Sequence, residues 1–352
     1  MPELLRQQVA AATAAGLPLR IRGGGSKDFY GQSLEGDVLD TRACQGIVAY
    51  EPAELVLSAR CGTPLRDIEA LLARHGQMLG FEPPHFGPDA TLGGCIATGL
   101  SGPRRATAGA VRDFVLGVKL MDGKGQILAF GGQVMKNVAG YDVSRALAGS
   151  LGILGLILET SIKVLPVPAA SATLVFDCDQ QQALTHMNTW AAAPLPISAS
   201  AWHAGQLRVR LAGAHAAVKA ARQKLGGQLI DAETANSWWA DLREQRLAFF
   251  AGDSALWRLS VPSMSAALDL PGEQLIEWGG ALRWWKTAAD ATTVRACATA
   301  GHATLFRADA TTRAQTQVFT PLAPTLMQIH RALKAKFDPA GIFNRGRMYP
   351  DL

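Results

Sequence analysis

The residues that could do chemistry begin with a run of three glycines, Gly23 to Gly25, between Arg22 and Ser26. Consecutive glycines lack Cβ atoms, so their backbone N–H groups can approach a polyanion closely. The flanking arginine and serine add a positive charge and a hydroxyl. The segment suits a pyrophosphate, although it has neither the Rossmann spacing nor a Walker A pattern. Taken alone, such a loop is more often a plain glycine turn.

Two further segments are rich in glycine, and small residues dominate the first of them. Residues 91–102 could lie against a flat ring or a phosphate chain, or could be a helix start packed closely through its small residues. Residues 136–142 are followed by glycines at 149, 152 and 155, three apart in the sequence. In a helical turn this spacing would place the three glycines on one face, for contact with a ligand or for close packing.

Short strands and helices must position these segments. A strand over Leu19–Arg22 leads directly into the glycine run, and the spacing predicts a helix over Thr63–His75. Thr63 is expected to cap that helix, with Pro64 in its first position. A hairpin is expected over residues 115–130, across the Asp-Gly-Lys-Gly turn at 122–125.

The composition changes near residue 166, where prolines at 166 and 168 end a strand. The second half holds all eight tryptophans and alternates helix-like with strand-like segments. The expected fold class is therefore α+β, with a mostly antiparallel sheet in the second half. A hairpin is expected there across Gly279 and Gly280.

Composition and charge exclude several functions. The chain has 352 residues, 48% hydrophobic and 18% charged, which is enough for large cores and argues against disorder. A net charge of +5 is too small for a nucleic-acid binder of this length. The five cysteines show no C-x-x-C spacing, so neither an iron–sulfur cluster nor another metal site is expected. With no signal peptide or transmembrane run, we expect a cytoplasmic protein, at most peripheral to the inner membrane through a partner.

Five segments together resemble, in order, the FAD-binding module of the vanillyl-alcohol oxidase and p-cresol methylhydroxylase (PCMH) flavoproteins. They are residues 22–27, 91–102, 109–117, 136–142 and 149–158. Residues 337–347 resemble the D-lactate and glycolate dehydrogenase branch of that superfamily. Residues 102–105 and 278–284 are similar to the FAD-binding E subunits of bacterial glycolate oxidases.

This resemblance implies a domain arrangement. Residues 1–168 would form a two-lobed PCMH-type FAD-binding domain, and residues 169–321 a smaller α+β cap domain. Residues 322–352 would be a C-terminal helix and tail that return to the FAD domain.

The resemblance also implies which residues hold the cofactor. The pyrophosphate would lie on the first loop, the flavin side along the second, and the adenosine end near the third. The implied residues are Arg22, Gly23, Gly24, Gly25, Ser26, Thr91, Gly93, Gly94, Ala97, Thr98, Gly152 and Ile157. Relatives that bind flavin covalently often carry a histidine in the place of Ser26, so non-covalent FAD is expected here.

The chain departs from the catalytic members of the branch because it lacks their His-x-Gly-Asp-Gly-Asn-x-His segment. Oxidation of a hydroxy acid needs a base for the hydroxyl proton and an anchor for the carboxylate. His302 is the candidate base, and the anchor is expected among three arginines of the cap strands, Arg258, Arg283 and Arg307. The alternative is that the arginines are surface groups and that His302 is structural.

The tryptophan pairs Trp238–Trp239 and Trp284–Trp285 could each present one ring outward as an interface contact, or both rings could pack in cores. The resemblance favours an interface, because the E subunit works beside a second flavoprotein subunit and an iron–sulfur subunit.

Three functions stay open from the sequence. The first is the FAD-binding subunit of a glycolate oxidase complex that converts glycolate to glyoxylate and passes electrons to partner subunits. The second is a self-sufficient FAD-dependent dehydrogenase for another small 2-hydroxy acid. The third is a flavin-bound structural or electron-relay subunit.

Overall fold

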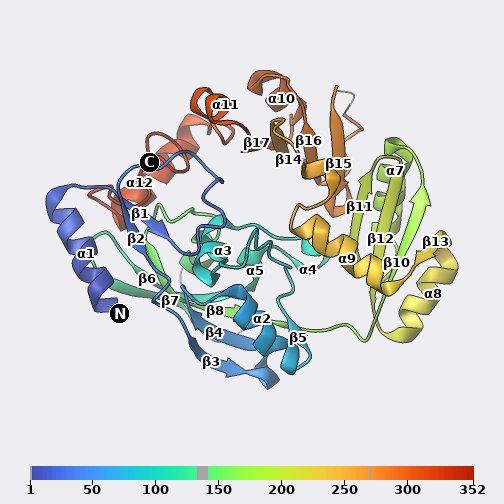
Figure 1. Cartoon of the computed structure of the whole chain (residues 1–352), viewed down its shortest axis with the longest axis horizontal. Coiled ribbons are helices and arrows are strands. Elements are labelled where there is room, and N and C mark those ends of the chain that lie inside the picture. Colours follow the sequence, from blue (N-terminus) through green and yellow to red (C-terminus); the bar gives the residue numbers. More distant parts are fainter. Residues whose placement is uncertain (1, 133–141, 269–270) are drawn as a thin grey trace. The chain divides into compact units, whose positions relative to one another are not determined.

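The computed structural model describes residues 2–132, 142–268 and 271–352, and it divides into two compact units (Figure 1). The first unit comprises Met1–Leu100, Ala110–Pro166 and Pro321–Leu352, and the second comprises Ser101–Gly109 and Val167–Thr320. The segment expected to contact the cofactor at residues 136–142 lies outside the described residues except for Asp142. No sequence pattern indicated that Ser101–Gly109 groups with the second unit.

A five-stranded antiparallel sheet forms the centre of the first unit, in the order β3-β4-β8-β6-β7. Its strands are β3 (Ile47–Glu51), β4 (Val56–Arg60), β6 (Val115–Met121), β7 (Ile127–Gly131) and β8 (Leu156–Lys163). The hairpin expected over residues 115–130 is confirmed as β6 and β7. The central strand β8 is buried along most of its length, and Ile162 has no exposed surface.

Two small sheets and several helices complete the first unit. The parallel pair is β1 (Leu19–Arg22) with β2 (Asp37–Asp40), and the antiparallel pair is β5 (Gln77–Met78) with β9 (Leu165–Pro166). The helices are α1 (Pro2–Ala15), α2 (Leu65–Arg74), α3 (Leu92–Thr98), α5 (Val111–Phe114), α6 (Val143–Ala146) and α12 (Pro324–Phe337). The strand expected before the glycine run is confirmed as β1.

The helix expected over Thr63–His75 begins two residues later than its sequence suggests. Pro64 occupies the N-cap position of α2, and Thr63 does not cap it. The Thr63 hydroxyl instead accepts a hydrogen bond from the Gly46 N–H at 2.9 Å. Within α2, Leu65, Ile68 and Leu72 recur at helical spacing and are completely buried.

An eight-stranded antiparallel sheet forms the second unit, which confirms the expectation for the second half. Its order is β13-β10-β12-β11-β15-β16-β14-β17. The strands are β10 (Ala170–Asp177), β11 (Ile197–His203), β12 (Gln206–Gly213), β13 (Gln228–Ile230), β14 (Leu256–Ser260), β15 (Glu273–Glu277), β16 (Leu282–Lys286) and β17 (His302–Arg307). The hairpin expected across Gly279 and Gly280 is the pair β15 and β16.

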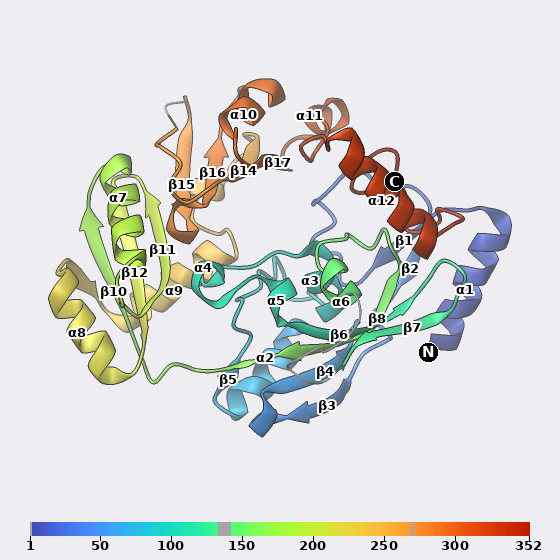
Figure 2. The same cartoon turned by 180° about the vertical axis from the view of Figure 1, so that it is seen from behind.

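Helices cover this sheet in two clusters (Figure 2). Helices α7 (Gln180–Ala191) and α8 (His215–Leu225) pack their buried side chains on β10 and β12. Helix α10 (Ala291–Cys297) packs through Val294 on Trp257 and Leu259 of β14. The other helices of the unit are α4 (Arg105–Ala108), α9 (Ala232–Arg243) and α11 (Ala310–Gln315). None of the helices described is long and apolar enough to cross a bilayer.

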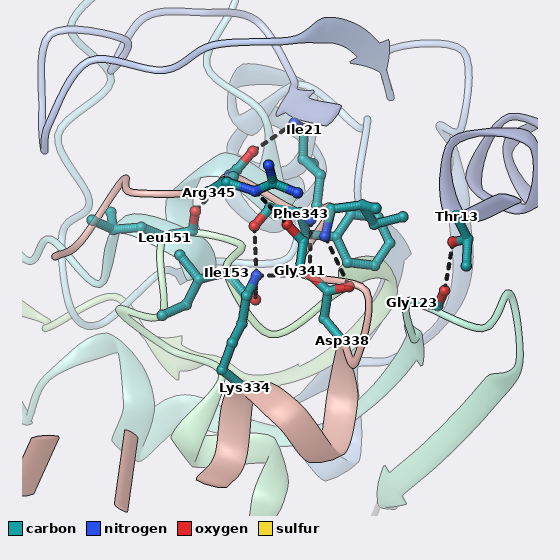
Figure 3. A network of polar contacts seen from close by, with 12 residues as sticks. Thr13, Ile21, Gly123, Leu151, Ile153, Lys334, Asp338, Gly341, Phe343 and Arg345 are labelled. Atoms are coloured by element: carbon teal, nitrogen blue, oxygen red, sulfur yellow. Dashed lines mark hydrogen bonds and ion pairs between the residues drawn. The ribbon is translucent and has the colours of Figure 1, made fainter. Parts of the chain in front are cut away.

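A buried ion pair ties the C-terminal segment into the first unit (Figure 3). The Lys334 ammonium donates to the Asp338 carboxylate at 2.7 Å and to the carbonyls of Ile153 and Phe343 at 2.8 and 2.7 Å. The same carboxylate accepts the N–H groups of Ile342 and Phe343. Burial lowers the pKa of Lys334, and the neighbouring Asp338 opposes that shift. Each polar group of the pair is therefore satisfied inside the core.

Asn344 extends this network to the start of the chain. Its side-chain oxygen accepts the Ile21 N–H at 2.7 Å, and its amide nitrogen donates to the Leu151 carbonyl at 2.6 Å. Its backbone N–H donates to the Leu19 carbonyl. One asparagine thus joins strand β1 to the turn that precedes β8.

We expect Lys334→Met to reduce the free energy of unfolding of the first unit by about 3–5 kcal/mol, because Asp338 would be left buried and unpaired. Urea unfolding followed by circular dichroism measures the change. Lys336→Met, at an exposed lysine of the same helix, is the matched control and should change it by less than about 0.5 kcal/mol. Equal effects of the two substitutions would contradict the role given to the pair.

Candidate functional site

One cavity of the first unit, about 790 Å³ including its open mouth, is lined by the glycine run. Its walls come from the loop after β1, from α3, from the turn before β8 and from the C-terminal segment. All twelve residues expected to contact the cofactor line it: Arg22, Gly23, Gly24, Gly25, Ser26, Thr91, Gly93, Gly94, Ala97, Thr98, Gly152 and Ile157.

The glycine run is required by close packing against the segment before α3. A Cβ atom on Gly24 would lie 1.5 Å from the Asp89 carbonyl oxygen, and one on Gly23 would lie 2.3 Å from the Thr91 hydroxyl oxygen. Gly25 has a φ of +75°, and a Cβ there would meet the Arg22 guanidinium. These glycines therefore bring the loop backbone against its neighbours.

The same loop leaves a row of backbone donors at the cavity. No residue that the structure describes accepts a hydrogen bond from the N–H groups of Gly23, Gly24, Gly25 or Ser26. Half-buried N–H groups of this kind are normally paired, so the row needs an acceptor. Successive amides around a concavity suit the oxygens of a diphosphate.

Positive charges hold the loop in place. The Arg347 guanidinium donates to the carbonyls of Gln32 and Asp28, both at 2.8 Å, and Arg22 pairs with the Asp28 carboxylate at 2.6 Å. The buried Lys27 ammonium donates to the His85 carbonyl at 3.2 Å. Asp28 offsets the charge of Arg22, and the charges of Lys27 and Arg347, which line the same cavity, favour an anionic ligand.

Helix α3 begins at the cavity with Thr91 as its N-cap, whose hydroxyl accepts the Gly94 N–H at 3.3 Å. The Thr98 hydroxyl donates to the Gly94 carbonyl. A Cβ on Gly93 would lie 2.7 Å from the Cys61 Cβ atom. The expected helix start packed through small residues is therefore present, and it lies in the cavity wall.

The expectation that Gly149, Gly152 and Gly155 share one face of a helical turn is wrong. Their φ angles are +87°, +74° and +154°, which no right-handed helix allows. The glycines instead permit tight turns. One turn passes close to the end of α3, where a Cβ on Gly99 would lie 2.8 Å from the Gly149 Cα atom. The turns let the Leu151 N–H bond the Ala97 carbonyl, which fixes α3.

Leu151, Asn344 and Arg347 are three of the cavity residues that sequence reasoning missed. Two of them lie in the ending that resembles the dehydrogenase branch, so a signal existed for the segment. It did not identify the individual side chains, because their contacts reach more than 190 residues back along the chain.

The candidate catalytic residues all belong to the sheet of the second unit. Arg258 is in β14, Arg283 in β16, and His302 and Arg307 are at the two ends of β17. Strand register pairs Arg258 with Thr304 and Ser260 with His302. Because alternate residues of a strand share a face, Arg258, Ser260, His302 and Thr304 share one face of the sheet.

The expectation that Arg283 could anchor a carboxylate needs correction. Its side chain has no exposed surface, and its guanidinium donates to the carbonyls of Gly280, Ser265 and Ala266 at 2.7–3.0 Å. Burial lowers its pKa to about 10. Its fork is already occupied by backbone, so the residue is structural.

His302 and Arg307 differ in their surroundings. His302 is exposed at the start of β17, but partial desolvation of its ring, and then the charge of Arg258, lower its pKa, so the imidazole is neutral near pH 7 and can accept a proton. The Arg307 guanidinium lies 5.5 Å from the Phe306 ring centre, and burial lowers its pKa.

The interface interpretation of the tryptophan pairs is not supported for Trp284 and Trp285. Both are buried, with 5% and 0% of their surface exposed, and their indole N–H groups donate to Glu277 and to the Pro271 carbonyl. In the other pair Trp239 is buried, and Trp238 lies 4.6 Å from the Arg208 guanidinium. Three of these four rings are core residues of the unit.

Comparison with known proteins identifies the family. A family described as an FAD binding domain matches residues 2–131. Glycolate oxidase subunit GlcE of Escherichia coli is 49% identical over 352 residues, covering 99% of this chain and 98% of that protein. The chain belongs to the GlcE family. It is therefore an FAD-dependent oxidoreductase, and FAD is its cofactor.

More distant relatives and a solved structure also match the chain. A mitochondrial D-lactate dehydrogenase of Saccharomyces cerevisiae is 29% identical over 42% of this chain and 27% of its own length. Subunit GlcD of Bacillus subtilis glycolate oxidase is 38% identical over 24% of this chain and 18% of its own. A solved alkyldihydroxyacetonephosphate synthase aligns with a TM-score of 0.66 and 16% identity, over 97% of this chain and 75% of its own. That alignment confirms the α+β fold class.

FAD fits the cavity on the structure's own terms. The row of unpaired amides offers donors to a diphosphate, the surrounding cations match its charge, and the small residues of α3 leave space for a flat ring. When FAD binds, Gly23 to Ser26 would hold the diphosphate through their backbone.

We expect Gly24→Ala to weaken FAD binding roughly ten- to hundred-fold. Its Cβ would displace the loop from the Asp89 carbonyl, and a hydrogen bond to a charged group contributes about 1.5–3 kcal/mol. Flavin fluorescence titration of the FAD-free protein measures the dissociation constant, and a melting curve checks the fold. Gly213→Ala, whose Cβ would make ordinary contact with Pro196, is the control. Wild-type affinity in Gly24→Ala would contradict this account.

Proposed function

We propose that this chain is the FAD-binding subunit of a glycolate oxidase complex, in which glycolate is oxidised to glyoxylate and the electrons pass to partner subunits. The observation that supports it best is the 49% identity to GlcE across nearly the full length of both chains. The cavity with its row of amides supports the cofactor part of the proposal. We also propose that the first unit is the PCMH-type FAD domain and that the second is the cap.

The partners would be a second flavoprotein subunit and an iron–sulfur subunit. The Escherichia coli relative is one subunit of glycolate oxidase, and the GlcD subunit of the Bacillus subtilis enzyme shares sequence with this chain. Two related flavin subunits would have arisen from one FAD-binding module. Electrons would leave this chain through the iron–sulfur subunit. FAD would be bound without a covalent link, because this chain has Ser26 where relatives that bind flavin covalently often have a histidine.

Oxidation of a hydroxy acid needs a hydride acceptor, a base and an anchor for the carboxylate. Bound FAD supplies the acceptor for the hydride of the substrate's C–H bond. His302 would accept the hydroxyl proton, since its lowered pKa keeps the ring unprotonated. The substrate carboxylate would be held by an arginine of the sheet, Arg258 or Arg307.

The complex purified with its partners should show anaerobic bleaching of its visible flavin absorbance when glycolate is added. His302→Gln should slow this bleaching roughly hundred-fold or more, because general-base catalysis contributes about 10²–10⁴ in rate. In the wild type the rate should be constant near neutral pH and fall only in acid, because the lowered pKa of His302 delays protonation of the ring to a pH below the ordinary histidine range.

His215→Gln, at an exposed histidine that begins α8, is the control and should leave the rate unchanged. A complex that contains FAD but never transfers electrons from glycolate would contradict the proposal. An unchanged rate in His302→Gln, with substrate reduction of a partner's flavin, would favour an electron-relay subunit.

A further inference from the structure

Trp278 is the point where two sequence motifs meet inside the second unit. Its indole N–H donates to the Gly102 carbonyl at 3.0 Å, and its ring is 96% buried. The Arg105 guanidinium of α4 lies 4.4 Å from the ring centre. The Arg258 guanidinium of β14 lies 5.2 Å from the same ring centre. Two positive charges from segments far apart in the sequence thus lie near one indole.

The backbone at Trp278 is held in an unfavourable conformation. Its φ is +55°, in the left-handed region that a bulky side chain rarely adopts. The next two residues, Gly279 and Gly280, also have positive φ angles, and a Cβ on Gly280 would lie 2.6 Å from the Ser263 carbonyl oxygen. Such strain persists where a particular side-chain position is required. Here the strained residue lies in the connection between β15 and β16, and its side chain is buried.

Arg258 carries a charge that nothing in its surroundings neutralises. Among the residues described, none accepts a hydrogen bond from its guanidinium, and none of the ion pairs includes it. Its neighbours on the same face of the sheet include Ser260, His302 and Thr304, and the buried Trp284 of β16. The opposite face of β14 packs on α10 through Trp257 and Leu259, so the arginine lies on the face away from that helix.

We infer that Trp278 positions Arg258 as the group that binds the carboxylate of a small 2-hydroxy acid. This inference rests on the proposed function and assigns its substrate anchor. A planar guanidinium matches a carboxylate through two parallel hydrogen bonds, but only if its orientation is fixed. The face of a tryptophan is the strongest aromatic partner for a guanidinium, and it fixes the plane of the fork without neutralising its charge.

Binding is tested on the FAD-loaded complex by calorimetry with oxalate, and with glycolamide as the neutral analogue of glycolate. The wild type should bind oxalate and not glycolamide. Arg258→Gln should abolish oxalate binding, and Arg258→Lys should weaken it roughly ten-fold, because a lysine lacks the fork. Oxalate binding that is equal in the wild type and Arg258→Gln would overturn the inference.

Turnover tests the positioning role. Trp278→Leu should raise the KM for glycolate roughly ten-fold with little change in kcat, and Trp278→Phe, which keeps an aromatic face, should lie between it and the wild type. Trp202→Leu, at a partly buried position, is the control, because that indole also donates to a carbonyl, of Cys178, and no arginine among the described residues stacks on it. A KM in Trp278→Leu no higher than in Trp202→Leu would overturn the role.

The outcomes separate this inference from the proposed function. If the wild-type complex binds oxalate through Arg258 but does not oxidise glycolate, the proposed function fails and the carboxylate site stands. If it oxidises glycolate and the variants at 258 and 278 keep the wild-type KM, the inference fails alone. If the complex does not assemble with Trp278→Leu, the same measurements are made on Trp278→Phe and Arg258→Lys.

Discussion

The structure of the first unit depends on one constraint: four successive backbone N–H groups, from Gly23 to Ser26, lie at a cavity without an acceptor from the described protein. Half-buried amides normally find partners, so keeping a row of them unpaired requires a rigid frame. Glycines allow the loop to press against the Asp89 carbonyl, and Arg347 fixes the loop from behind through two carbonyls. The frame is built before the ligand arrives, which reduces the entropy lost on binding.

The C-terminal segment supplies much of that frame. Asn344 bonds both the strand that enters the glycine loop and the turn on the other side of the cavity. It is held there by the buried pair of Lys334 and Asp338, whose remaining polar groups are satisfied by backbone. A buried charge is costly unless it is paired in this way, so the pair fixes the tail in one position. The C-terminal segment therefore contributes Asn344 and Arg347 to the cavity that the glycine loop lines.

The sequence was sufficient to predict the parts of the site that depend on local residue type. The glycine run, the strand before it and the small residues of α3 could be predicted because their chemistry is local. Arg283 could not be judged, since only the fold shows its guanidinium buried against three carbonyls. The helical turn predicted for the glycines from 149 to 155 is wrong, because their spacing does not reveal the sign of φ. Trp278 drew attention through its motif, but its two arginine neighbours come from distant segments.

Hydrogen–deuterium exchange of the loop amides tests the central claim most directly, with and without FAD. The account predicts rapid exchange at Gly24, Gly25 and Ser26 in the FAD-free protein, because these amides have no acceptor, and strong slowing when FAD binds. The Ile21 amide, which already bonds Asn344, should exchange slowly in both states. Exchange at residues 24–26 that FAD leaves unchanged, while FAD is bound, would contradict the claim that this row of amides holds the cofactor.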